Sequence, residues 1–245
     1  MSVFVDAFRF MGDNLSLLWT KTIEHLELSG AAIAVAVVIA VPLGLWLGHR
    51  HRGSFLAINV ANIGRALPSL AVIAIGLAFL GIGFVNVMVA LVVLAVPPIL
   101  TNAYLAVDQV DRDTVLAAEG MGMRPRQVFA RVELPMSLPL LFAGIRTSAV
   151  YVVATATLAA IAGGGGLGDI IVNQASYRLA GVVAGAIWVA ALALLVDLAF
   201  GALQRVVTPR GLRRSAEAAG MPPPPDVGAP APAVTGRPVP GTELN

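Results

Sequence analysis

The chain has 245 residues, of which 58% are hydrophobic and only 12% are charged, and its mean hydropathy is +0.84. A soluble domain carries about 25% charged residues, so this composition argues against an aqueous enzyme or a nucleic-acid-binding protein. It favours an integral membrane protein. The sequence has no cysteine, which excludes disulfides, thiolate chemistry and cysteine-ligated metals.

Residues 1–27 are expected to form an N-terminal interfacial segment. This stretch is charged and lacks the basic start, apolar core and small-residue cleavage site of a signal peptide. Its aromatic residues Phe4, Phe8, Phe10 and Trp19 suit the headgroup region of a bilayer.

Five apolar runs follow, covering residues 28–47, 68–84, 85–107, 140–162 and 181–203. A helix needs about 20 apolar residues to cross the hydrocarbon core, and the short second run can extend toward residue 55. The runs are continuous rather than alternating, which favours helices over strands. The sequence therefore predicts an all-α integral membrane fold with five transmembrane helices, within a membrane domain over residues 28–206.

Arginine side chains gather in the loops on one side of these five spans. They are Arg50, Arg52, Arg112, Arg124, Arg126, Arg131, Arg205, Arg210, Arg213 and Arg214. Because basic loops stay in the cytoplasm, the N-terminus is expected outside and the C-terminus inside. Residues 207–245 are rich in Pro, Ala and Gly and are predicted to be a disordered cytoplasmic tail, either regulatory or dispensable.

A polar loop, residues 108–139, lies between the third and fourth spans. Residues 114–121 and 126–132 are each predicted to form a short helix, with Gly122 and Pro125 at the join. The first helix carries small residues that allow close approach of another protein. The loop is therefore either a docking site for a soluble partner or an amphipathic segment lying on the membrane.

The spacing in this loop resembles that of ATP-binding-cassette importer permeases. Their coupling loop reads Glu-Ala-Ala, three residues, Gly, nine residues, an aliphatic residue, any residue, Leu-Pro. Here Leu116 replaces the glutamate, and Glu119 lies three residues later. The residues that the resemblance assigns to ATPase coupling are Ala117, Ala118, Glu119, Gly120, Gly122, Val132, Leu134 and Pro135.

Residues 25–48, 65–72, 120–128 and 157–171 are similar to permeases for glycine betaine, choline and related osmoprotectants. The resemblance implies a type I importer permease fold in the bacterial inner membrane. It also implies import of glycine betaine, choline, carnitine or proline by alternating access. Methionine-importer permeases share the glycine-rich segment, so methionine or another amino acid is the alternative solute.

The same resemblance implies cytoplasmic ATP-binding-cassette subunits, a second permease copy or paralogue, an extracytoplasmic solute-binding protein and membrane lipid as partners. The sequence contains no G-x-x-x-x-G-K-[ST] motif, so a partner chain is expected to hydrolyse ATP. The chain itself is predicted to be neither an enzyme nor a nucleic-acid binder, and no cofactor is expected. The alternatives from other classes are an autonomous membrane channel and a membrane-embedded enzyme.

A glycine-rich run between the last two spans fits G-x-G-x-x-G, but a dinucleotide site needs a βαβ unit, which a membrane span cannot supply. The run is predicted to turn tightly or re-enter at the outer mouth, so that Asp169 faces solute or a binding protein; a plain flexible loop is the alternative. The candidate pathway or gate residues are Arg65, Pro68, Ser69, Gly163, Gly164, Gly165, Gly166, Gly168 and Asp169.

Two charges lie inside predicted spans, where they are usually paired or functional. From their distance to the span ends, Arg146 and Asp197 reach similar depths and are predicted to form a structural ion pair. Arg65 either extends to the cytoplasmic interface, if the second span begins near Leu67, or lies at an inner gate beside Ser69.

His25, His49 and His51 are expected at span ends, and no metal-ligand cluster is visible in the sequence. Aromatic faces bind quaternary ammonium groups, but the tryptophans and tyrosines do not cluster in sequence. Selectivity is therefore expected to reside mainly in the external binding protein.

Overall fold

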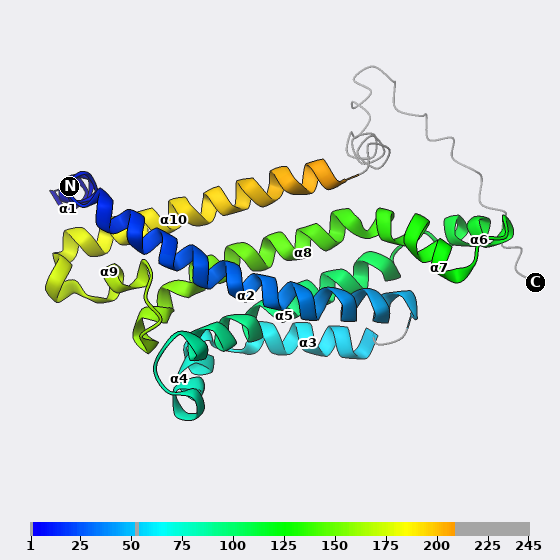
Figure 1. Ribbon diagram of the computed structural model, residues 1–245, viewed down its shortest axis with the longest axis horizontal. Coiled ribbons are helices and arrows are strands. Elements are labelled where there is room, and N and C mark those ends of the chain that lie inside the picture. Colours follow the sequence, from blue (N-terminus) through cyan, green and yellow to red (C-terminus); the bar gives the residue numbers. More distant parts are fainter. Residues whose placement is uncertain (1, 52–53, 209–245) are drawn as a thin grey trace, which may run out of the picture. The chain divides into compact units, whose positions relative to one another are not determined.

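The computed structural model describes residues 2–51 and 54–208, and almost all of these residues are helical (Figure 1). The predicted tail therefore lies outside the described residues, apart from its first two positions. The chain forms α1 (Ser2–Asp13), α2 (Leu15–His49), α3 (Ser54–Ala66), α4 (Ser69–Leu80), α5 (Phe84–Asp108), α6 (Arg112–Gly120), α7 (Pro125–Val128), a π-helical turn η1 (Phe129–Glu133), α8 (Leu134–Thr155), a 3₁₀ segment η2 (Ala156–Ala162), α9 (Gly168–Val172) and α10 (Gln174–Val207).

Within the described part, 4 helical stretches are long and apolar enough to cross a membrane: 15–49, 84–108, 125–162 and 174–207. They correspond to the first, third, fourth and fifth predicted spans. The first is longer than expected, because α2 runs unbroken through the predicted boundary between residues 27 and 28. Of the N-terminal segment, only α1 is a separate helix.

The second predicted span differs, because it consists of two shorter helices, α3 and α4. The break falls at Leu67 and Pro68, where Pro68 caps α4 with an extended backbone. Proline has no N–H and disfavours helical backbone in the residue before it. The apolar part of this region is thus α4 (Ser69–Leu80), and α3 is a separate helix before it.

The core of the bundle depends on close contact between α2 and α5. Small residues recur at every fourth position of α2, and all are buried: Ala32, Ala36, Ala40, Gly44 and Gly48. A side chain added at Gly44 would lie 2.5 Å from the Cβ of Ala103, and one added at Gly48 would lie 2.6 Å from the carbonyl oxygen of Tyr104. Small residues let membrane helices approach closely where no hydrophobic effect drives them together.

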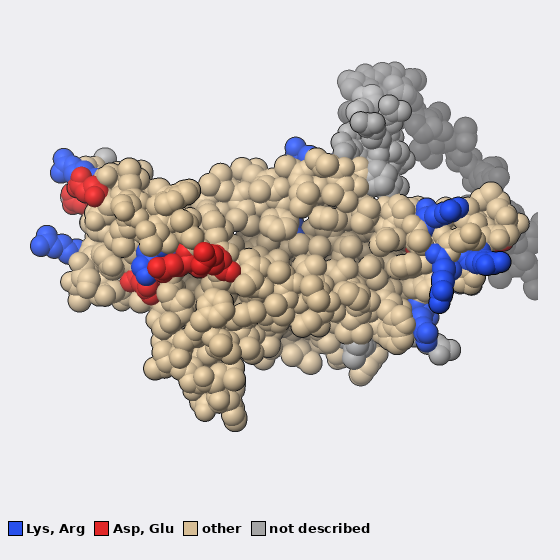
Figure 2. Space-filling view, in the orientation of Figure 1, with Lys and Arg blue, Asp and Glu red and all other residues tan. Residues whose placement is uncertain are grey.

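The helices place the connecting segments at two ends (Figure 1). At one end lie the end of α2, the start of α3, α6 and α7; we call it the coupling-loop end. At the other lie α1, the α4–α5 turn and the segment from η2 to the start of α10, here called the glycine-turn end. Figure 2 shows lysine and arginine gathered at the coupling-loop end, whereas acidic and basic side chains are mixed at the other.

Candidate functional site

The coupling loop folds into two short helices with defined ends. Asp111 caps α6, since its carboxylate accepts hydrogen bonds from the backbone N–H of Asp113 at 3.2 Å and the hydroxyl of Thr114 at 2.9 Å. Gly122, with φ of +82°, turns the chain out of α6. Pro125 then opens α7 in the first-turn position that proline favours.

The predicted coupling residues do not all face outward. Ala117, Glu119 and Gly120 are exposed, and a side chain added at Gly120 would meet nothing within 4 Å. Ala118, by contrast, is only 2% exposed and packs inside the protein. The expectation that Ala118 helps to open a small-residue surface to a partner is therefore wrong, because its methyl group is already covered by the chain itself.

The rest of the predicted set lies at other places in the loop. Gly122 is exposed at the turn between the two helices, while Val132, Leu134 and Pro135 are half-buried where η1 enters α8. Leu116, at the position where the resemblance calls for glutamate, is 52% exposed. The exposed set is thus confined to α6 and the turn that follows it.

The loop is tied to the end of α2 by a side-chain contact that the sequence analysis missed. Nδ1 of His49 lies 2.6 Å from Oε2 of Glu133, and the Glu133 residue is 3% exposed. The His49 ring also meets the ring of Phe129 edge-on, with centroids 5.0 Å apart. Phe129 and Glu133 are the first and last residues of the π-helical turn. The end of α2 therefore contacts the segment that joins the loop to α8.

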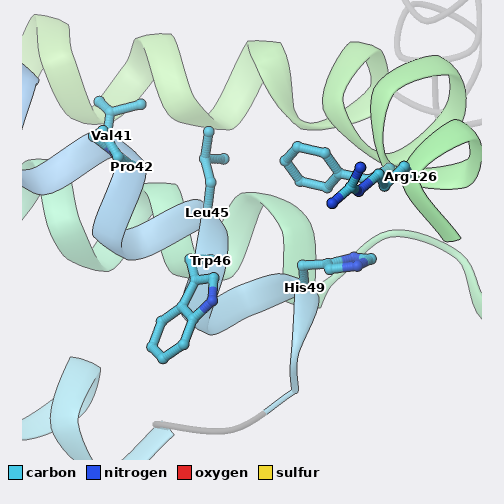
Figure 3. Close-up of a pocket in the computed structure, with 7 residues that line it drawn as sticks. Val41, Pro42, Leu45, Trp46, His49 and Arg126 are labelled. Atoms are coloured by element: carbon cyan, nitrogen blue, oxygen red, sulfur yellow. The ribbon is translucent and has the colours of Figure 1, made fainter.

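Two cavities flank this tie. One, of about 470 Å³, is lined by Val41, Pro42, Leu45, Trp46, His49, Arg126 and Phe129 (Figure 3). The other, of about 490 Å³, is bordered by Leu116 and Glu119 as well as by Glu133. Residues three apart lie on one helix face, so Glu119 stands beside Leu116 on the wall of the second cavity.

At the glycine-turn end, the predicted gate residues form a close-packed turn. Gly163, Gly165 and Gly166 have φ values of +70°, +77° and +85°, which side-chain-bearing residues rarely adopt. A side chain added at Gly166 would lie 3.1 Å from Nδ1 of His25, and one added at Gly168 would collide with the carbonyl oxygen of Thr157. Glycine is needed here for both conformation and space.

Charged side chains fasten this turn to α2. Nζ of Lys21 lies 2.8 Å from Oε2 of Glu24 and 2.7 Å from Oδ2 of Asp169. Oε2 of Glu24 also accepts a hydrogen bond of 3.0 Å from the backbone N–H of Gly166. Asp169 is thus paired within the chain, and neither Lys21 nor Glu24 was predicted as a site residue.

His25 was expected at the end of a span, but it lies inside the long helix α2. It is fully buried, and its Nε2 lies 2.8 Å from the carbonyl oxygen of Val153. Because a carbonyl can only accept, Nε2 carries the proton and Nδ1 is a bare acceptor, with no hydrogen-bond partner in the described part. Residues 2–51 and 54–208 contain no group of three or more metal-ligating side chains.

The two charged residues inside predicted spans, Arg146 and Asp197, form an ion pair. Nε and Nη2 of Arg146 each lie 2.6 Å from an oxygen of Asp197, in the bidentate geometry favoured by guanidinium and carboxylate. Gln204 also joins the same two helices, donating a 2.9 Å hydrogen bond to the carbonyl oxygen of Pro139. Gln204 therefore provides a second polar contact between α8 and α10.

The remaining pathway residues surround the break in the second span. Pro68 is exposed, Ser69 is half-buried, and both begin α4. Arg65 lies in α3, one residue after Gly64, which packs against Pro97 near the middle of α5. The choice between an interfacial and a gate position for Arg65 stays a prediction, since its side chain lies outside the described residues.

The chain resembles known proteins over most of its length. Residues 40–213 match the family described as the inner membrane component of binding-protein-dependent transport systems. The choline transport system permease protein OpuBB of Bacillus subtilis is 39% identical over 210 residues, which cover 85% of this chain and 97% of that protein. The carnitine transport permease protein OpuCB of Listeria monocytogenes is 39% identical over 218 residues, covering 89% and 99%.

A solved structure shares the fold. An inward-facing form of the MetNI methionine ABC transporter superposes with a TM-score of 0.66 at 23% identity, covering 80% of this chain and 98% of that one. The all-helical membrane fold expected from the sequence is thereby confirmed.

Proposed function

This chain belongs to the family of inner membrane components of binding-protein-dependent transport systems, and from that premise we propose that it is the permease subunit of an ATP-driven importer of osmoprotectants. The observation that carries the proposal is the identity of 39%, across nearly the whole length, with permeases named for choline and carnitine. The methionine transporter shares the fold at only 23% identity, so an osmolyte with a trimethylammonium group is the favoured solute.

The coupling loop, residues 108–139, is the proposed docking site for cytoplasmic ATP-binding-cassette subunits. Its exposed small residues Ala117 and Gly120 allow a partner's backbone to approach a short helix, and Glu119 offers a charge beside them. The chain has no phosphate-binding motif of its own. Energy for transport must then come from ATP hydrolysed by the partner.

Movement of the loop has two physical routes into the membrane helices. The first is continuous backbone, because η1 leads directly into α8. The second is the contact of His49 with Glu133, which joins the loop to α2. A tilt of the loop would therefore move α2 and α8 together, which is what alternating access requires.

The arginines at the coupling-loop end support a cytoplasmic position for that end, an outside N-terminus and an inside C-terminus. A second copy or paralogue would complete the pathway, and a solute-binding protein would dock at the glycine-turn end. The chain is proposed to sit in the bacterial inner membrane, with α1 at the interface, the membrane domain beginning with α2 at Leu15 and ending near residue 206, and a tail over residues 207–245.

The test is uptake of radiolabelled solute into liposomes that contain the whole importer, reconstituted from this chain and the products of neighbouring reading frames. We expect ATP-dependent uptake of choline, glycine betaine or carnitine, and little uptake of methionine. Uptake at the full rate without nucleotide would indicate a channel instead.

The docking surface is tested with Gly120→Phe, which adds a large side chain where the chain itself has open space. We expect it to reduce co-purification of the ATPase subunit by about tenfold or more, because a well-packed interface loses roughly 1–3 kcal/mol when overpacked. The matched control is Gly12→Phe in α1, another exposed helical glycine with nothing within 4 Å of an added Cβ, but at the opposite end. Equal co-purification of both variants would argue against the docking surface.

A further inference from the structure

A cavity of about 280 Å³ lies where α3, α5 and α8 come together, near the middle of α5. Its size is close to the lower end, about 300 Å³, of small-molecule sites. Four of its lining residues are polar but uncharged: Thr101 and Asn102 of α5, and Thr147 and Tyr151 of α8. Thr147 and Tyr151 are exposed on the surface of the chain.

Polar side chains on an exposed face are unfavourable against lipid tails. Thr147 and Tyr151 lie one helical turn apart on α8, so they form a single polar stripe rather than two isolated groups. Together with the cavity, this stripe points to a face that meets water or solute inside the assembled transporter.

The hydrogen bonds around the cavity give it a definite polarity. Thr147 donates its hydroxyl proton to the carbonyl oxygen of Ala143 at 2.9 Å, leaving the oxygen lone pairs. Asn102 turns its Nδ2 to the carbonyl oxygen of Pro98 at 2.8 Å, and Gly144 packs on that same side of the amide. The amide oxygen of Asn102 therefore takes no part in the bond to Pro98.

Two adjacent prolines add to this polarity. Pro97 and Pro98 have no N–H, so the carbonyls of Val93 and Leu94, one turn earlier, lack their usual helical donor. Leu94, Pro97 and Pro98 all line the cavity. The described lining of the cavity carries no formal charge.

We infer that this cavity holds the trimethylammonium group of the solute during its passage, with the ring of Tyr151 and the oxygens of Asn102 and Thr147 as its contacts. A quaternary ammonium group has no N–H to donate and spreads its positive charge over methyl groups, which aromatic faces and oxygen lone pairs attract. The absence of a carboxylate in the described lining keeps the contact weak enough for release. The inference rests on the proposed function and locates the solute within it.

The first experiment measures ATP-driven uptake by the complete importer in liposomes. We expect Tyr151→Leu to lower the uptake rate of choline and glycine betaine by about threefold to tenfold, the range of a partly desolvated cation–aromatic contact. Tyr151→Phe keeps the ring and should retain most of the rate. Dimethylglycine, the tertiary-amine analogue of glycine betaine, should be affected less by the loss of the ring.

A matched pair of threonines separates a role in the cavity from a role in the helix. Thr147→Val removes a hydroxyl from the cavity, and we expect about a twofold to threefold slower uptake, as for the loss of a weak polar contact. Thr20→Val removes a hydroxyl with the same bond to a carbonyl four residues earlier, but on an exposed part of α2 outside the cavity. That control should transport at the wild-type rate.

A second measurement does not depend on rates, and it uses the fact that the chain has no cysteine. In Thr147→Cys, a thiol reagent bearing a trimethylammonium group should react from water, block uptake, and be slowed by choline. Failure of the reagent to react, together with wild-type uptake by Tyr151→Leu and Thr147→Val, would place the cavity against lipid and overturn the inference. If the wild-type importer still takes up osmoprotectants in that case, the proposed function is retained and only the cavity inference is wrong. If the wild-type importer takes up no osmoprotectant, both the proposed function and the cavity inference are wrong.

Discussion

The two ends of the helical bundle differ in how closely their glycines are packed. At the glycine-turn end, Gly168 has no room for a Cβ beside the carbonyl of Thr157, and Gly166 has little room beside His25. At the coupling-loop end, Gly120 lies in open space, and the short helices of the loop are exposed. The first end is closely packed, while the second leaves Ala117 and Gly120 exposed, where we propose that another protein docks.

The polar contacts differ in the same way. Lys21, Glu24 and Asp169 form a connected group that also holds the backbone of the glycine turn. The loop over residues 108–139 meets the end of α2 in two side-chain pairs, the buried Glu133 with His49 and the exposed Asp108 with His51 at 3.1 Å. We propose that the buried pair passes movement of the loop to α2.

The largest difference between the two ends is expected when a side chain is added at a glycine of each. Gly168→Val should destabilise the protein by about 3 kcal/mol, the upper range for overpacking, because the new atoms meet backbone that cannot yield cheaply. Gly120→Val should change stability by no more than about 0.5 kcal/mol, as for an exposed site. Thermal unfolding of the purified chain in detergent measures both, and similar midpoints would contradict the contrast.

A smaller effect is expected at the buried tie, and on coupling rather than on folding. Glu133→Ala should lower uptake per ATP hydrolysed by about fivefold, the lower range of coupling between sites, because the loop still binds its ATPase but no longer moves α2. Glu133→Gln can still bond to His49 and should retain most of the coupling. Parallel assays of ATP hydrolysis and uptake in liposomes decide this; unchanged coupling in Glu133→Ala would assign the tie to folding alone.

The smallest effect concerns the position where the family's glutamate is replaced. Glu119 borders the same cavity as Leu116, so we predict that it supplies the missing charge. Glu119→Gln should weaken ATPase binding by about threefold, the scale of an exposed ion pair, whereas Leu116→Glu should change it by less than about twofold. Binding of the ATPase subunit to the immobilised permease measures both, and a strong gain from Leu116→Glu would show that the site lacks a charge.

Much of the fold follows from the sequence because its signals are local. An apolar run in lipid must form a helix to satisfy its own backbone, so the long spans could be predicted from hydropathy alone. The pairing of Arg146 with Asp197 could also be predicted, since a fixed helical rise sets the depth of each residue. The two short helices of the loop could also be predicted, since Gly122 and Pro125 mark the join between them.

The tertiary structure alone decided which side chains meet across the bundle. Glu24 finds Gly166 and His49 finds Glu133 because α2 packs against segments far along the chain, and hydropathy does not specify which faces of two apolar helices touch. The same packing covers Ala118 and gathers Asn102 and Tyr151 around one cavity. Burial in lipid drives each helix to form, whereas the fit of small residues between helices determines where each side chain points.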